Sequence, residues 1–233
     1  MDIVYVYKDF SKEKWAFDNW VELKYSLRSI SNLSHNKVFI VWDNPNRTKN
    51  IIHIPVNDNL DTPYKNVLNK LRIICDSKQI SDNFILMNDD FFILKPIKTI
   101  PYYSNWTLKQ HLNNIHDKNY QRAVLNCLKL FPDGINYNLH TPIIYNKKLL
   151  KQTLQLIGDQ SISIRSVYWN QHKLKHTNFF SVFGRADSKV RHHNIKDIKN
   201  IESQSYLSSN DELNYKFKQF LNKTLPNSSN YIK

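Results

Sequence analysis

The segment "FILMNDDFFIL", residues 84–94, places the polar triplet Asn88, Asp89 and Asp90 inside a run of eight apolar residues. Its first half, "FILM", is the kind of short apolar run that forms a buried strand. We therefore expect a strand here, with the triplet at the point where it leaves the core. In a chain that stayed extended, Asn88 and Asp90 would point to one side and Asp89 to the other, because side chains alternate along a strand.

The residues before this segment alternate between apolar runs and amphipathic patterns. Runs rich in β-branched and aromatic residues predict strands, and aliphatic residues spaced three and four apart predict helices. The expected order is strand, helix, strand, strand, helix, strand, at residues 2–7, 20–33, 37–43, 51–56, 64–77 and 83–94. Because parallel strands need crossover helices, this order predicts an α/β fold, a single domain with a largely parallel central sheet flanked by helices.

The second half of the chain has weaker patterns. They predict helices at residues 119–131 and 146–157, and short strands at residues 139–145 and 176–184. After residue 195 the chain is polar, with one helical pattern at residues 211–223 and a tail, residues 224–233, that we expect to fray. We expect one domain at 1–195, followed by a C-terminal helix and tail at 196–233.

Composition restricts the class of partner. The formal charge of +13 predicts attraction to a polyanion such as nucleic acid or an acidic glycan, although the lysine-rich coding of an AT-rich genome gives the same excess. Cys75 and Cys127 lack zinc-site spacing, which favours free thiols in a reducing compartment. No run approaches the roughly 18 apolar residues of a membrane span, and the first residues do not resemble a signal peptide. We expect a cytoplasmic protein.

The position of the acidic triplet suggests a metal site. In open α/β sheets, ligands bind outside the carboxyl ends of the strands, where this triplet is expected. Adjacent carboxylates repel, so a partly buried pair needs a cation or hydrogen-bond donors. Mg²⁺ or Mn²⁺ held by one or two carboxylates keeps its other positions for water and diphosphate oxygens. The alternative is a turn in which Asp89 and Asp90 cap a helix or face solvent.

Several motifs in the chain resemble the Stealth family of sugar transferases. "DIVYVYKD", "ELKYSLRSI", "VFIVWD" and "ISDNFILMNDDFFILKPI", within residues 2–97, are similar to the first two conserved regions of that family. "LHTPIIYNKKLL", "SIRSVYWN" and "RADSKV" resemble its later segments. The resemblance implies a GT-A-like nucleotide-binding fold, a nucleotide-sugar donor and a divalent metal, Mn²⁺ or Mg²⁺. It also implies that residues 1–195 form a catalytic domain, with the nucleotide and metal half at about 1–100 and the acceptor half at about 101–195.

The resemblance also implies roles for residues in the first half. Asp90 would bind the metal directly. Asn88 and Asp89 would contact the metal, the ribose or the donor sugar, with Asp89 also a catalytic candidate. Asp9, just after the first strand, would lie near the nucleotide. Arg28, in the matched helix, would hold phosphate, because a guanidinium fits phosphate oxygens; the alternative is a surface ion pair.

Three residues of the second half complete the expected site. His140 lies in the histidine-proline segment and is a candidate metal ligand and catalytic group. Arg165 is a second candidate for binding phosphate. Asp187 is a candidate catalytic base or a third metal ligand. Each has a simpler alternative as a packing or surface residue.

Together these features predict a metal-dependent glycosyltransferase that moves a sugar from a nucleotide sugar to an acceptor hydroxyl. The favoured acceptor is a hydroxylated base in DNA, modified by a phage enzyme in the host cytoplasm, because the chain is short and basic. One alternative is a Stealth-type transfer of a sugar or sugar 1-phosphate to a capsule or other surface polysaccharide. A second is a nucleic-acid-binding protein without catalytic activity.

Overall fold

A five-stranded sheet forms the centre of the computed structural model, which describes residues 1–8, 20–57, 59–183, 187–190, 204–209, 213 and 215–233. The strand order is β3-β2-β1-β4-β7, with bounds β1 (Asp2–Tyr7), β2 (Val38–Trp42), β3 (Ile52–Pro55), β4 (Asn83–Met87) and β7 (Ile143–Asn146). β1 pairs in parallel with β2 and β4, and β2 pairs in parallel with β3. β7 is antiparallel to β4. The predicted largely parallel sheet is confirmed, with an antiparallel strand at one edge.

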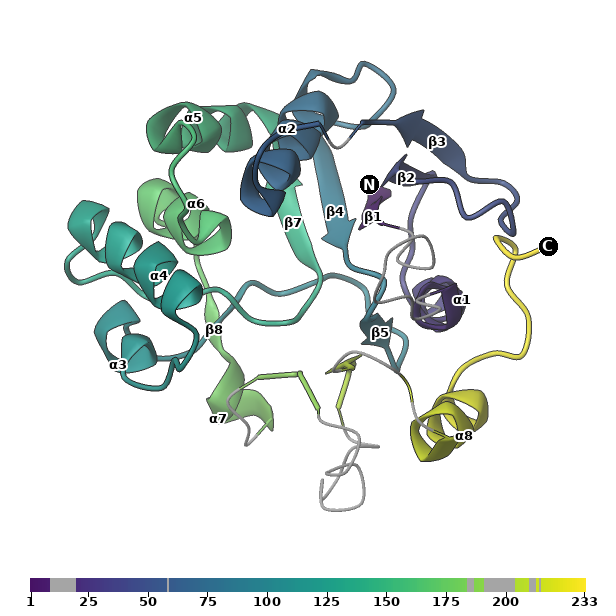
Figure 1. Ribbon diagram of the computed structural model, residues 1–233. Helices are drawn as coiled ribbons and strands as arrows, with labels where there is room; N and C mark the ends of the chain where they lie inside the picture. The colour runs from purple at the N-terminus through teal and green to yellow at the C-terminus, as the bar shows by residue number, and fades with distance from the viewer. Residues whose placement is uncertain (9–19, 58, 184–186, 191–203, 210–212, 214) are drawn as a thin grey trace.

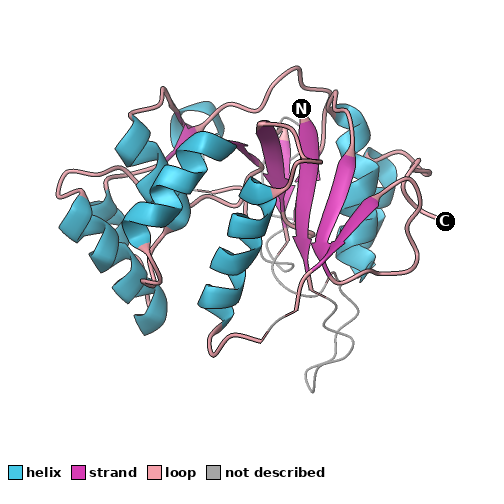
Figure 2. Cartoon of the chain, turned by 90° about the horizontal axis from the view of Figure 1, so that it is seen from above, coloured by secondary structure: helices cyan, strands magenta, loops and turns pink. Residues whose placement is uncertain are grey.

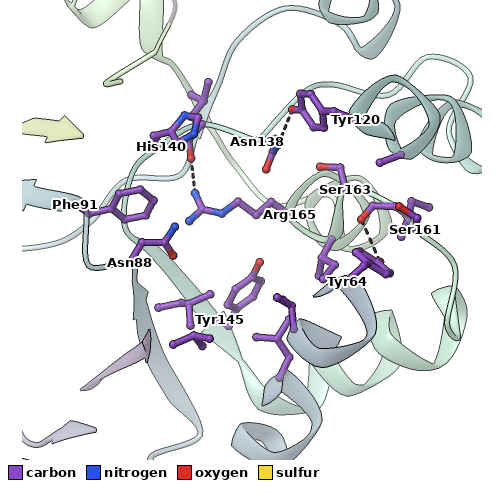
Figure 3. A pocket seen from close by; sticks show the side chains of 18 of the residues that line it. Tyr64, Asn88, Phe91, Tyr120, Asn138, His140, Tyr145, Ser161, Ser163 and Arg165 are labelled. Carbon is purple, nitrogen blue, oxygen red and sulfur yellow. Dashed lines mark hydrogen bonds between the residues drawn. The ribbon is translucent and has the colours of Figure 1, made fainter. Parts of the chain in front are cut away.

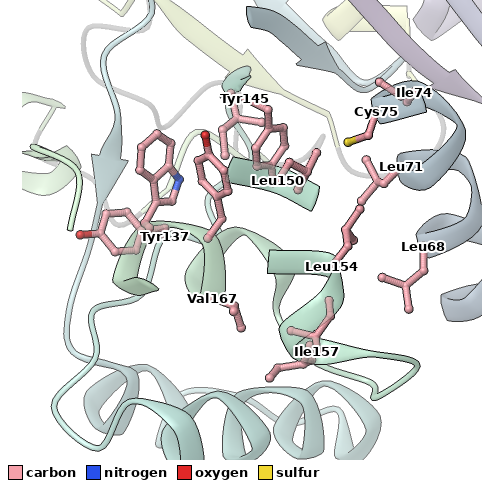
Figure 4. Close-up of a cluster of buried hydrophobic side chains, with 14 of the residues drawn as sticks. Leu68, Leu71, Ile74, Cys75, Tyr137, Tyr145, Leu150, Leu154, Ile157 and Val167 are labelled. Carbon is pink, nitrogen blue, oxygen red and sulfur yellow. The ribbon is translucent and has the colours of Figure 1, made fainter. Parts of the chain in front are cut away.

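Helices cover both faces of this sheet (Figures 1 and 2). Tyr5 of β1 points to one face, where it packs with Leu23 of α1 (Trp20–Ser29). Val4 points to the other face, where α2 (Pro63–Asp76) and α5 (Lys147–Ile157) bury their aliphatic side chains (Figure 4). Burial on both faces explains why these strands are continuous apolar runs.

The acidic triplet separates two strands that belong to different sheets. The Phe91 amide donates to the Asn88 carbonyl at 3.2 Å, which closes a turn. β5 (Phe91–Ile93) then pairs antiparallel with β9 (Tyr206–Ser208), and Phe92 packs against Phe217 with ring centroids 6.1 Å apart. The expectation of one extended strand is therefore wrong, because the chain turns at the triplet and the residues after it pair with β9 in a separate sheet.

Residues 176–184 do not form the expected strand over the part that the structure describes. β8 (Thr177–Asn178) is short and pairs with β6 (Tyr103–Ser104), after which the chain forms α7 (Phe179–Phe183). Phe179 and Phe183, four residues apart, both pack on Tyr103, with ring centroids at 5.2 and 5.7 Å. That spacing fits a helix. The remaining elements are η2 (Ile30–Asn32), α3 (Leu108–Leu112), α4 (Lys118–Leu130), α6 (Ile164–His172) and α8 (Tyr215–Thr224).

The C-terminal tail is hydrogen-bonded to the segment between β2 and β3. The expectation that the tail frays is therefore wrong. The Lys49 amide donates to the Tyr231 carbonyl at 3.0 Å, and the Lys233 amide to the Arg47 carbonyl at 3.0 Å. The His35 ring lies 2.7 Å from the Tyr231 hydroxyl. The predicted C-terminal helix is present as α8, whereas the expected boundary after residue 195 lies outside the described residues.

Both cysteines are free and buried, as expected. None of the helices in the described ranges is long and apolar enough to cross a membrane.

Candidate functional site

A pocket of about 630 Å³ opens at the carboxyl ends of β1, β2 and β4. The wall formed by β1, β2 and α2 is mostly apolar, with Val6, Trp42, Tyr64, Val67 and Leu71. The polar wall, formed by residues after β4, before β7 and around the start of α6, has Asn88, Asp89, Asn138, His140, Ser163 and Arg165, and Figure 3 labels all of them except Asp89. Such a combination of an apolar wall and a few convergent polar groups is typical of small-molecule sites.

The antiparallel direction of β7 explains why residues distant in sequence meet here. Parallel strands place their carboxyl ends at one edge of the sheet, so Asn88 and Asp89 follow β4 at that edge. β7 runs the other way, with Leu86 opposite Ile143, so the residues before β7 lie at the same edge. His140 therefore lies in the pocket beside the polar triplet.

His140 and Asp187 form a hydrogen-bonded pair. His140 Nδ1 lies 2.6 Å from Asp187 Oδ2, and the His140 amide donates to Asp187 Oδ1 at 2.8 Å. Burial by itself would raise the pKa of Asp187, but the hydrogen bonds from His140 and Ser188 outweigh it and hold the pKa below its usual value. Because Nδ1 faces Asp187, Nε2 is the ring nitrogen left for a ligand in the pocket.

Arg165 lies in the first turn of α6 and holds the backbone on both sides of His140. Its Nη1 donates to the carbonyl oxygens of Leu139 and Thr141, the latter at 2.8 Å (Figure 3). Its guanidinium carbon lies 5.5 Å from the centroid of the Phe91 ring. Burial lowers the pKa of Arg165, yet a guanidinium remains charged at physiological pH. Within the described part of the chain Nε and Nη2 make no hydrogen bond, so they can bind a ligand.

The turn at the triplet separates its two carboxylates. Asp89 lines the pocket with Asn88, whereas Asp90 accepts a hydrogen bond at 2.9 Å from the Ser208 hydroxyl of β9. Burial raises the pKa of Asp90 above its usual value.

The three expected metal ligands do not come together as one set. Over the described ranges, no three His, Cys, Asp or Glu side chains are grouped so that they can hold a metal ion. The expectation that Asp89, Asp90 and His140 jointly bind the metal is therefore corrected, because the turn directs Asp90 towards β9.

Arg28 is not brought to the pocket. It is 3% exposed, and its guanidinium donates to the Pro226 carbonyl, to Asn222 Oδ1 at 2.8 Å and to the Leu225 carbonyl at 3.1 Å. These contacts fix the end of α8 and the start of the tail. Arg28 therefore forms neither the surface ion pair nor the phosphate contact that were considered for it. Asp9 lies outside the described residues.

Two aromatic residues of the pocket, Trp42 and Tyr145, had not been expected to act in the site. Trp42 has φ 107°, a conformation that is rare for a bulky residue and is often associated with functional sites. The Lys70 ammonium lies 3.1 Å from the centroid of its ring. The only signal in the sequence was the position of Trp42 at the end of a buried strand, before the turn sequence "NPNR".

Comparisons with solved structures find distant similarity to transferases. The glycosyltransferase GlyE of Streptococcus pneumoniae TIGR4 aligns with a TM-score of 0.44 and 11% identity, over 89% of this chain and 53% of GlyE. The galactosyltransferase LgtC, in complex with donor and acceptor sugar analogues, aligns with a TM-score of 0.47 and 10% identity, over 98% and 97% of the two chains. A 4-diphosphocytidyl-2C-methyl-D-erythritol synthase from Anaerococcus prevotii aligns with a TM-score of 0.37, 10% identity and coverage of 76% and 83%.

The chain thus spans about half the length of GlyE. No protein-family profile matches the sequence, and no curated protein matches it. The resemblance to the Stealth family therefore remains a prediction. Because these identities and TM-scores are low, the function of the chain is inferred from the residues of its own pocket.

Proposed function

We propose that this chain is a glycosyltransferase that moves a sugar from a nucleotide-sugar donor to an acceptor hydroxyl. One observation carries the proposal: a cation, a carboxylate and an oriented imidazole, from Arg165, Asp89 and His140, line a single pocket of about 630 Å³. This volume is within the roughly 300–1,000 Å³ of small-molecule sites. These groups suit the transfer of a sugar from a nucleoside diphosphate, which needs positive charge beside the departing diphosphate and a base for the acceptor hydroxyl.

The donor would lie across both walls of the pocket. The nucleobase suits the apolar wall, where Trp42 offers a flat ring. The diphosphate suits the polar wall, where Nε and Nη2 of Arg165 are available for phosphate oxygens.

A divalent metal fits the donor set in part. Asp89 and the amide oxygen of Asn88 are hard oxygen ligands on the pocket wall, and Mg²⁺ commonly uses one or two carboxylates and completes its shell with substrate phosphates. We therefore place the metal at Asp89. Its chemistry would be to offset the charge of the departing diphosphate.

His140 would act as the general base. As the acceptor oxygen forms its bond to the anomeric carbon, the hydroxyl proton moves to His140 Nε2. The bond between the anomeric carbon and the phosphate oxygen breaks, and the diphosphate leaves with the electron pair beside Arg165. Asp187 is a positioning residue, because it holds Nδ1 and stabilises the imidazolium that forms.

For the acceptor we retain the hydroxylated base in DNA, supported by the net charge of +13. No contact among the described residues of the pocket adds to this choice. Transfer of a sugar 1-phosphate, or transfer to a surface polysaccharide, would use the same donor pocket. The products distinguish these reactions from sugar transfer to DNA.

The test is a product assay with a panel of nucleotide sugars and Mn²⁺, with hydroxymethylated DNA and with polysaccharide as acceptors. Release of a nucleoside diphosphate and a hexose-sized mass increase of the DNA are expected. A nucleoside monophosphate product would indicate transfer of sugar phosphate. If no donor in the panel were consumed with any acceptor, the enzymatic proposal would be refuted, which leaves the nucleic-acid-binding alternative.

The metal placement has its own test. Asp89→Asn should lose the dependence of activity on Mn²⁺ concentration, whereas Asp90→Asn should keep it. The reverse pattern would show that Asp90 is the ligand.

A further inference from the structure

Tyr145 places a phenol at the floor of the pocket. Its side chain lines the pocket although only 1% of the residue is exposed. Figure 3 shows the hydroxyl pointing into the cavity, below Arg165. Throughout the described ranges no group forms a hydrogen bond with this hydroxyl.

The ring of Tyr145 is fixed by its neighbours. It packs edge-to-face on Tyr168 with centroids 4.7 Å apart, and in a tilted arrangement on Phe84 with centroids 5.9 Å apart. The Tyr168 hydroxyl accepts a hydrogen bond from the Asn146 amide at 3.0 Å, which holds that ring in turn. A hydroxyl without a partner costs free energy, and the packing of its ring keeps this one facing the pocket. The pocket is therefore where its partner must come from.

We propose that Tyr145 donates a hydrogen bond to a phosphate oxygen of the donor's diphosphate, beside Arg165. This inference rests on the proposed function and adds a residue outside the charged set already assigned to it. An anionic oxygen is favoured over a sugar hydroxyl because the site lies next to the Arg165 guanidinium, which attracts negative charge. Burial raises the pKa of Tyr145 well above its usual range, so the phenol stays protonated and remains a donor at neutral pH.

The experiment compares the wild-type protein with Tyr145→Phe, which removes only the hydroxyl. Binding of uridine, guanosine, adenosine, cytidine and thymidine diphosphates is measured by calorimetry, together with the corresponding nucleosides. For the diphosphate that the wild type binds, affinity should fall about 10- to 100-fold, as expected for a hydrogen bond to a charged group. Affinity for the nucleoside, which lacks phosphate, should not change.

Stability separates this role from a structural one. Since the hydroxyl has no partner within the described protein, Tyr145→Phe should melt at the same temperature as the wild type or higher. A role in packing predicts a lower melting temperature. Tyr168→Phe is the matched control: it removes a phenol from the same ring pair, outside the pocket, and should lower the melting temperature while leaving diphosphate affinity within about twofold.

Each other outcome has a defined meaning. Equal diphosphate affinity in wild type and Tyr145→Phe would overturn the inference and leave the proposed function intact. A defect seen with the intact nucleotide sugar but not with the diphosphate would also overturn it, because the contact would then be to the sugar. A wild-type protein that binds none of the five diphosphates would refute the proposed function itself.

Discussion

Substitution of Asp187 by Asn tests the centre of the proposed mechanism, because it keeps the shape of the side chain and removes its charge. The carboxylate accepts the Nδ1 contact of His140 at 2.6 Å and two backbone amides. A hydrogen bond to a charged group contributes about 1.5–3 kcal/mol. The two side chains are 36% and 27% exposed, so screening by solvent lowers this to about 1–2 kcal/mol. We expect the free energy of unfolding to fall by that amount.

The effect of Asp187→Asn on catalysis should be larger than its effect on stability. The amide can turn its NH₂ group towards His140, which disfavours the orientation and the imidazolium form that a general base needs. General-base catalysis contributes about 10²- to 10⁴-fold, so kcat should fall at least about 100-fold. KM for the donor should stay within about threefold, since Asp187 is not placed on the donor. Initial rates of nucleoside diphosphate release and urea unfolding measure the two effects.

A metal titration gives the result that would refute this reasoning. If His140 held the metal and were not the base, loss of its carboxylate partner would weaken metal binding about 10- to 100-fold. Raising the Mn²⁺ concentration would then restore the rate of Asp187→Asn. Full restoration contradicts the base assignment, and a rate that stays low at saturating Mn²⁺ agrees with it.

The pH dependence of stability supplies an independent check on the same variant. The folded-state pKa of Asp187 is lowered, so its contribution to stability is present above its unfolded value of about 3.9 and is lost as the pH falls through the folded value. Wild type and Asp187→Asn should therefore differ in melting temperature at pH 7 and converge below pH of about 4. A difference that persists in acid would show that the charge of Asp187 is not its source.

Three further substitutions test other parts of the structure. Asp90→Asn should raise the melting temperature at pH 7, because the raised folded-state pKa of Asp90 means that its ionised form destabilises the fold. The gain in melting temperature should shrink as the pH falls towards the unfolded pKa of about 3.9, and a gain independent of pH would contradict this. Arg28→Ala should lower the free energy of unfolding by about 2–4 kcal/mol in urea titrations, because its charged hydrogen bonds are lost, and KM for the donor should not change. A raised KM with unchanged stability would show instead that Arg28 contacts the donor. Trp42→Ala should weaken nucleoside diphosphate binding by about 1–3 kcal/mol in calorimetry, the contribution of one base stacked on an aromatic ring, and unchanged affinity would exclude Trp42 as the base platform.

The central sheet could be predicted from the sequence because its signals are local. β1, β2 and β4 are buried on both faces, so each is a continuous apolar run bounded by polar residues. The segment after Asp90 could not be predicted in the same way. Its apolar residues pair with β9, more than a hundred residues later in the chain, and no local period distinguishes a continuing strand from a turn followed by a new one.

Long-range contacts also explain the different outcomes for the two arginines. Arg28 and Arg165 were given similar roles because both lie in segments that resemble the Stealth family. The partners of Arg28, from Asn222 to Pro226, lie almost two hundred residues away, and its sequence neighbours carry no sign of them. Arg165 bonds to carbonyls of a segment only about 25 residues earlier, next to a histidine already identified as a candidate.

In the proposed mechanism, the position of Arg165 would link binding of the donor to the geometry of the base. One edge of its guanidinium, through Nη1, holds the carbonyls on either side of His140, while the Ser188 hydroxyl donates to the His140 carbonyl itself. Three consecutive carbonyls are thus fixed, and the imidazole cannot shift without breaking one of these bonds. The other edge of the guanidinium is available for the diphosphate. A donor bound there would contact the same planar guanidinium that holds the His140 segment. Donor binding would therefore stabilise the aligned position of His140, and an aligned His140 segment would favour donor binding to the same extent.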